Sequence, residues 1–363
     1  MADVVLSPSS APRTVLIIGT GLIGGSIGMA LRELGWYVAG VDVDDTVVQG
    51  ALDAGALDAV GWPDDAHLTI VATPSLAIPQ AVNDALKRTS GWVTDVGSVK
   101  FDLVRAVDNP RFVGGHPMAG SEQEGVAGAR SDMFNGATWV LTPGDHSDDA
   151  ALAVMHVLVK SLGAEVLTLD ARQHDRLVAM VSHVPHLTAA TLMRLADERS
   201  EEHRALLKLA AGGFRDMTRI ASGRPSIWPD ICAGNKTAIV EVLDDLIVAL
   251  QEMRGTVQTN DSAALLDVLS QAQRARVNLP TTAPASVDLA VVRVVISDQP
   301  GELAVITRLA TDIDVNIYDL EIAHSAEGTQ GVLVLVVEQA RSERLMGALM
   351  ANGYRPSVRE MAQ

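Results

Sequence analysis

Cysteine is almost absent from this chain: a single one, Cys232, stands among 363 residues. One cysteine forms no intrachain disulfide, which favours a reducing compartment, the cytoplasm. No apolar run reaches the length of about 18 residues that a membrane span needs, so we expect none. The opening residues MADVVLSPSSAP lack a charged segment followed by an apolar core, which argues against a signal peptide.

Aromatic residues are also scarce, at 3%, although hydrophobic residues in total make up 48% of the chain. Positive charge is in deficit, because 28 Lys and Arg stand against 45 Asp and Glu, for a net charge of −17. Nucleic-acid affinity depends on neutralising phosphates, so we expect no nucleic-acid partner. In so acidic a chain, a local cluster of arginines is a stronger indication of an anion site.

Three stretches of different character predict three domains. In residues 13–170 apolar strands alternate with helical stretches, which predicts a Rossmann-type parallel sheet with helices on both faces. Residues 171–280 are helical throughout and predict an all-helical substrate and dimerisation domain. After the linker-like segment NLPTTAPAS, residues 287–363 alternate as strand, helix, strand, strand and helix. That order predicts a small ferredoxin-like α+β domain.

The segment GTGLIG has the context of a dinucleotide-binding turn. It follows an apolar strand and opens a helical stretch, and Asp42 stands 18 residues past Gly24 at the end of the second strand. Asp42 is expected to accept hydrogen bonds from a ribose and to repel a 2′-phosphate, which favours NAD over NADP. Thr73 ends the third strand, where a plain loop is the alternative. The predicted cofactor-binding residues are Gly19, Gly21, Leu22, Ile23, Gly24, Asp42 and Thr73.

Two later strands deliver polar side chains to one edge of the predicted sheet. The strand in GWVTDVGSVK leads to Ser98, and RFVGGHPMAG carries His116 between glycines and a proline. Ligands of open α/β sheets bind beyond the carboxyl ends of the strands, so these two side chains are expected to converge near the nicotinamide. His116 is a candidate general base. Ser98 is a candidate substrate contact, or simply the cap of the next helix.

The helical region holds two further clusters. SHVPH carries His183 and His186, and GGFRDMTRIASGRPSIW carries Arg215, Asp216 and Arg219. Arg215 and Arg219 are four residues apart, so we expect them to share a helix face. Like charges on one face indicate an anion there, although a solvated face paired with nearby acids is the alternative. Elsewhere histidines and carboxylates lack metal-ligand spacing, so no metal is predicted.

Taken together, GTGLIGGSIG, VTDVGSVK, GGHPMAGSEQEGV, SHVPH and GGFRDMTRIASGRPSIW resemble the prephenate/arogenate dehydrogenases of tyrosine biosynthesis, over about residues 14–278. The resemblance implies that NAD oxidises the ring carbinol of prephenate with loss of CO2, giving 4-hydroxyphenylpyruvate. Arogenate, which would give L-tyrosine directly, is the open alternative. The resemblance also implies a homodimer through the helical domain.

The same resemblance implies a role for each site residue. His116 takes the hydroxyl proton, Ser98 helps to hold that hydroxyl, and Arg219 binds a substrate carboxylate. The remaining residues of the implied substrate-binding network are His186, Glu122, Asp216 and Arg215.

Near the C-terminus, SDQPGELAVITRLATDIDVNIYDLEI resembles an ACT regulatory domain. Asp298 and Gly301 lie in its strand-to-helix turn, and Asn316 opens the next strand; these are the predicted regulatory residues. Pathway logic favours L-tyrosine as the effector, bound between paired modules. A purely structural turn is the competing interpretation, since the same residues also cap a helix.

Three other interpretations share parts of this pattern. A β-hydroxyacid dehydrogenase has the same Rossmann-plus-helices plan but would carry a helical lysine in G-x-G-x-x-x-K, which the helical region lacks. A metal-dependent reductoisomerase would need clustered acidic ligands. A catalytically silent NAD-sensing regulator belongs to another class, and the presence of Ser98, His116 and Arg219 argues against it.

Overall fold

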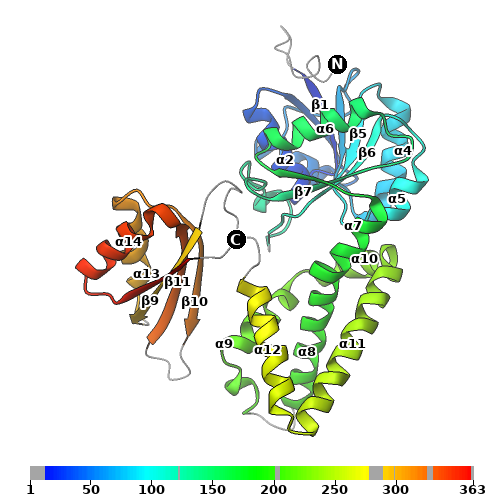
Figure 1. Cartoon of the computed structure of the whole chain (residues 1–363). Helices are drawn as coiled ribbons and strands as arrows, with labels where there is room; N and C mark the ends of the chain where they lie inside the picture. The colour runs from blue at the N-terminus through cyan, green and yellow to red at the C-terminus, as the bar shows by residue number, and fades with distance from the viewer. Residues whose placement is uncertain are drawn as a thin grey trace. The chain divides into compact units, whose positions relative to one another are not determined.

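The computed structural model describes residues 13–121, 123–200, 205–277, 289–297, 299–324 and 330–360. The chain divides into two compact units (Figure 1). The first consists of Met1–Glu198 and Thr218–Val248, and the second of Arg199–Met217 and Ala249–Gln363.

An eight-stranded sheet lies at the centre of the first unit, in the order β3-β2-β1-β4-β5-β6-β7-β8. Neighbouring strands from β3 to β6 are parallel, β7 is antiparallel to β6, and β8 is parallel to β7. The chain order reverses between β1 and β4, which is where ligands bind in such sheets. The strands are β1 (Thr14–Ile18), β2 (Tyr37–Val41), β3 (Ala59–Val60), β4 (Leu68–Val71), β5 (Trp92–Asp95), β6 (Phe112–Pro117), β7 (Thr138–Pro143) and β8 (Glu165–Thr168).

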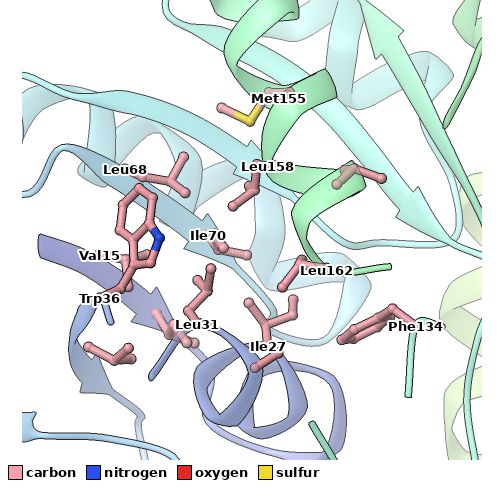
Figure 2. Close-up of a cluster of buried hydrophobic side chains, with 14 of the residues drawn as sticks. Val15, Ile27, Leu31, Trp36, Leu68, Ile70, Phe134, Met155, Leu158 and Leu162 are labelled. Carbon is pink, nitrogen blue, oxygen red and sulfur yellow. The ribbon is translucent and has the colours of Figure 1, made fainter. Parts of the chain in front are cut away.

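Helices cover both faces of this sheet, so its central strands β1 and β4 are buried along their whole length. Every residue of β1 is buried, and successive side chains point to opposite faces. Val15 packs with Ile27 and Leu31 in the cluster of Figure 2, whereas Leu16 joins Val82 in a second cluster. The helices are α2 (Leu22–Glu33), α3 (Asp45–Asp53), α4 (Ile78–Arg88), α5 (Phe101–Ala106) and α6 (Asp149–Ser161), with 3-10 turns η1 (Ser75–Ala77) and η2 (Val126–Gly128).

Between residues 171 and 277 the described residues form helices and turns without a strand, as predicted. A π-helical turn, η3 (Ala179–His183), stands just before Pro185, whose ring nitrogen has no proton to donate to the preceding turn. None of the described helices is long and apolar enough to cross a membrane. The helices are α7 (Ala171–Val178), α8 (Val184–Ser200), α9 (Gly212–Thr218), α10 (Trp228–Gly234), α11 (Lys236–Gln258) and α12 (Ser262–Val277), with 3-10 turns η4 (Leu207–Leu209), η5 (Arg219–Ser222) and η6 (Pro225–Ile227).

The C-terminal part of the second unit is a four-stranded antiparallel sheet in the order β10-β11-β9-β12. Two helices pack on this sheet and bury an apolar core with it (Figure 1). This is the predicted ferredoxin-like arrangement. Its elements are β9 (Leu289–Ser297), α13 (Glu302–Asp312), β10 (Ile317–His324), β11 (Gln330–Glu338), α14 (Gln339–Ala351) and β12 (Pro356–Glu360).

Candidate active site

The glycines between β1 and α2 have separate structural roles. Gly19 has a φ of +92°, and a Cβ there would lie 2.6 Å from the backbone of Ala72. A Cβ on Gly24 would lie 2.0 Å from the carbonyl oxygen of Gly19, so this position needs glycine for packing. A Cβ on Gly21 would contact nothing within 4 Å. Space is therefore open at Gly21, where a pyrophosphate approaches the backbone in dinucleotide-binding turns.

Two further residues around this turn fit a dinucleotide. Asp42 follows β2 and accepts a hydrogen bond from the Thr20 amide at 2.8 Å, which fastens the end of β2 to the glycine turn. The Thr73 hydroxyl, after β4, is buried and has no hydrogen-bond partner within the described chain. Because an unpaired buried hydroxyl is costly, a ligand group is the natural partner for it. We conclude that the residues present fit NAD.

His116 is buried at the end of β6 and heads a chain of hydrogen bonds. Its Nδ1 lies 2.9 Å from Nε2 of His174 on α7. The Nδ1 of His174 lies 2.7 Å from Oδ1 of Asp175. The Asp175 carboxylate accepts two more hydrogen bonds, from the backbone amides of Lys100 and Phe101, each at 2.9 Å.

These contacts determine where the ring protons sit. An ionised Asp175 only accepts, so Nδ1 of His174 is the donor and its Nε2 is the acceptor. Nε2 of His174 then accepts a hydrogen bond from the Nδ1–H group of His116. His116 is left with an unprotonated Nε2, which is the form that a general base requires. Within the described residues no hydrogen bond involves that nitrogen.

The surroundings also keep His116 neutral. Burial lowers the pKa of His116 well below 6.5, and the nearby His174, Lys100 and His183 lower it further. A histidine whose pKa lies below the working pH is unprotonated, so His116 can accept a proton throughout the neutral range.

A buried ion pair supports the segment that carries Ser98. Asp95 ends β5 and pairs with the Lys100 ammonium, and both side chains are fully buried. Asp95 also accepts from the amides of Gly97 at 2.8 Å and Gly115 at 3.2 Å, which ties this segment to β6. Ser98 is half-buried within it. The N-cap of α5 is Lys100, so Ser98 is not the N-cap of that helix.

A second histidine cluster lies on η3 and α8. The Asn235 amide nitrogen lies 3.2 Å from Nδ1 of His183, so this nitrogen is the acceptor. Burial lowers the pKa of His183 to about 4, consistent with a neutral ring. His186 stacks on Trp228, with ring centroids 3.7 Å apart and an interplanar angle of 15°. Burial also lowers the pKa of His186.

Arg219 opens η5 and is exposed. A Cβ on Gly223, just after this turn, would lie 3.6 Å from Cε1 of His186, so the turn stands beside the second histidine cluster. Arg224 forms an ion pair with Glu124 at 3.6 Å, which joins this segment to the loop that follows His116. The segments carrying His116, His186 and Arg219 are therefore neighbours in the first unit.

Four other predicted residues are Arg215, Asp216, Glu122 and Asp298. Because α9 ends at Thr218, Arg219 begins a separate 3-10 turn, and the expected single helix face of Arg215 and Arg219 is interrupted. Arg215 and Asp216 are exposed residues of α9, and Arg215 donates to the Ala210 carbonyl at 3.1 Å. Glu122 and Asp298 lie outside the described residues. Among those described, no three His, Cys, Asp or Glu side chains are arranged to hold a metal ion.

Sequence reasoning missed several residues of this network. Asp95 and Lys100 lie in VTDVGSVK and Trp228 lies in GGFRDMTRIASGRPSIW, but the predictions drawn from these motifs concerned Ser98 and the arginines. His174, Asp175 and Asn235 stand in no such motif, and the one available signal for the first two was an adjacent His-Asp pair near the start of an amphipathic helix. The residues missed as site components are Asp95, Lys100, His174, Asp175, Trp228 and Asn235.

Residues 27–168 match the family model described as prephenate dehydrogenase, nucleotide-binding domain, and residues 170–271 match prephenate dehydrogenase, dimerization domain. The chain is 33% identical to the prephenate dehydrogenase of Bacillus subtilis (strain 168) over 339 residues, which cover 88% of this chain and 91% of that protein.

Two solved structures are similar at 28% identity. One is prephenate dehydrogenase from A. aeolicus in complex with hydroxyphenyl propionate and NAD+, with a TM-score of 0.70 over 74% of this chain and 99% of that one. The other is Synechocystis arogenate dehydrogenase, with a TM-score of 0.64 over 72% of this chain and 98% of that one.

Proposed function

The chain belongs to the prephenate dehydrogenase family, and we propose that His116 is the general base of its reaction. The reaction is the NAD-dependent oxidative decarboxylation of prephenate to 4-hydroxyphenylpyruvate. The observation that carries the proposal is the 2.9 Å contact between Nδ1 of His116 and Nε2 of His174, with Asp175 behind His174, from which we infer that Nε2 of His116 is unprotonated. A buried, neutral imidazole at the carboxyl end of a sheet strand is suited to take the carbinol proton.

NAD, when bound, supplies the acceptor for the hydride that leaves the ring carbinol. His116 takes the hydroxyl proton as the carbinol carbon becomes a carbonyl. Ser98, half-buried after the neighbouring strand β5, holds the hydroxyl oxygen in reach of that base. The ring carboxylate then leaves as CO2, and the electrons of the broken C–C bond complete the aromatic ring. Aromatisation drives this last step, so no residue has to supply a Lewis acid.

Arg219 binds a substrate carboxylate, and the stacked pair of His186 and Trp228 lies beside its turn. A guanidinium is suited to this role because its planar donors match a carboxylate. Glu122, Asp216 and Arg215 belong to the polar network around the substrate in this proposal.

The proposed function is tested by steady-state turnover of purified enzyme, followed as NADH formation. Prephenate with NAD should be the efficient pair, and arogenate should have a kcat/KM lower by about 100-fold or more, since a misplaced charged group typically costs several kcal/mol. NADP should be a poor oxidant because the Asp42 carboxylate repels a 2′-phosphate. Equal use of prephenate and arogenate would contradict the substrate assignment. Equal use of NAD and NADP would contradict the role of Asp42.

The enzyme is a homodimer in this proposal. Residues 170–271 match a dimerization-domain model. Apolar side chains remain exposed on α11 and α12, among them Ile247, Leu250, Val257, Leu266 and Leu269. Exposed apolar surface of this kind is typical of a subunit interface. We also propose that the enzyme acts in the cytoplasm, because a chain with a single cysteine is typical of a reducing compartment.

The C-terminal ferredoxin-like module is the proposed ACT-type sensor of L-tyrosine. Gly301 has a φ of +96° and caps α13 without a side-chain hydrogen bond, so its turn leaves backbone amides for an amino-acid carboxylate. Asn316 is exposed just before β10, and Asp298 completes the proposed regulatory residues.

Comparing full-length enzyme with a truncation ending at Ser286 tests this regulation. L-Tyrosine should inhibit the full-length enzyme and leave the truncated enzyme active and insensitive. In the full chain, Asn316→Ala should weaken inhibition, with Asn352→Ala as a matched exposed control. Equal inhibition of both lengths would show that tyrosine acts only as a product-like ligand of the active site.

A further inference from the structure

We infer that His174 and Asp175 form a proton relay behind His116. When Nε2 of His116 takes the hydroxyl proton of the substrate, its Nδ1 passes a second proton to Nε2 of His174. This inference rests on the proposed function of His116 as the base. It gives a role to His174 and Asp175, two buried residues whose presence is not explained by the base alone.

The geometry supplies a continuous path. His116 Nδ1 and His174 Nε2 are 2.9 Å apart, and His174 Nδ1 and Asp175 Oδ1 are 2.7 Å apart. All three side chains are buried, so no solvent competes for these hydrogen bonds. Backbone amides of Lys100 and Phe101 hold the carboxylate of Asp175 in place. The Asn235 amide donates to the Asp175 carbonyl at 2.8 Å and fixes the backbone of the same helix.

Each bond in the relay is accounted for. The substrate O–H bond breaks as an N–H bond forms at Nε2 of His116. The Nδ1–H bond of His116 breaks as an N–H bond forms at Nε2 of His174. His116 ends neutral, and the positive charge ends on His174, directly against the Asp175 carboxylate. The hydride of the same carbinol goes to NAD, the oxidant of the reaction.

The groups around His116 explain why the positive charge should pass from His116 to His174. Lys100, between β5 and α5, carries a positive charge, and Asp95 on β5 is already paired with it. His183 faces His116 from η3 and, with Lys100 and burial, lowers the pKa of His116. A positive charge is therefore unfavourable on His116. Its partner His174 has a carboxylate in direct contact, and charge-assisted hydrogen bonds of this kind are about twice as strong as neutral ones.

His174→Gln separates a relay from mere positioning. The glutamine amide oxygen can occupy the position of Nε2 of His174 and accept a hydrogen bond from Nδ1–H of His116. The tautomer of His116 is then kept, while the basic nitrogen of His174 is lost. The single-turnover rate of NADH formation should fall by roughly 10- to 100-fold, within the range usual for proton-transfer groups. KM for prephenate and Kd for NAD should change by less than about threefold, because neither ligand touches residue 174. His156→Gln, at an exposed histidine of α6, is the matched control.

The number of protons transferred in the chemical step is a second, independent test of the relay. Single-turnover rates measured in mixtures of H2O and D2O should follow a curved dependence on deuterium content in wild type, since two protons move together. They should follow a straight line in His174→Gln. A straight line in wild type, or a wild-type rate in His174→Gln, would overturn the relay and leave the role of His116 intact. Absence of prephenate turnover by wild type would instead overturn the proposed function.

Discussion

Replacing His116 with asparagine should lower kcat by a factor of about 10²–10⁴, the usual contribution of a positioned general base. The asparagine amide nitrogen stands near the position of Nδ1 and can still donate to His174, so the buried network is kept. What disappears is Nε2, the nitrogen proposed to take the substrate proton. NAD does not depend on that atom, so Kd for NAD should change little.

The same base predicts the pH dependence of wild type. Burial, together with the nearby His174, Lys100 and His183, holds the pKa of His116 well below 6.5. The active, unprotonated form therefore persists as the pH falls, and kcat/KM, which reports the free enzyme, should stay on its plateau through pH 6.5 before it declines. His156→Asn, at an exposed histidine, should leave kcat and the pH profile of kcat/KM unchanged. Near-normal kcat in His116→Asn would refute the assignment of the base.

Arg219→Ala should raise KM for prephenate by roughly 30- to 150-fold, the equivalent of about 2–3 kcal/mol for a lost charged hydrogen bond. In the proposed function the guanidinium binds a carboxylate away from the reacting carbon, so kcat should fall much less than KM rises. Gly223, just after the turn that carries Arg219, stands beside His186, so this segment neighbours the second histidine cluster.

Two variants separate recognition of the substrate from a general charge effect. Arg219→Lys keeps the charge without the planar donors and should recover part of the lost affinity. Arg194→Ala removes an exposed arginine of α8 that pairs with Glu198, and it should leave KM unchanged. An unchanged KM in Arg219→Ala would assign Arg219 to a solvated face, the alternative that the spacing had left open.

The parts of the fold that follow from local pattern could be predicted from the sequence. The buried run in β1, the glycine turn and the later change to helices carry their own signals, and the structure has the predicted Rossmann-type sheet, helical region and ferredoxin-like module. The antiparallel pairing of β7 with β6 has no such signal. A strand pattern indicates which face is buried but does not give the direction of its neighbour.

The candidate site could be predicted only where a motif surrounds the residue. Gly21, Asp42 and His116 stand in such motifs. His174 and Asp175 do not, because their importance arises from a contact with residues 58 or more positions away in the chain. The shared helix face of Arg215 and Arg219 was an inference from spacing, and the end of α9 at Thr218 interrupts it.

The role of His116 as the base depends above all on its protonation state in the resting enzyme. Nitrogen-15 NMR of histidine-labelled wild type, with His116→Asn to identify the signal, reports which ring nitrogen carries the proton. We expect a protonated Nδ1 and an unprotonated Nε2 at pH 7, as the hydrogen bond to His174 requires. A proton on Nε2, alone or together with one on Nδ1, would refute this role of His116.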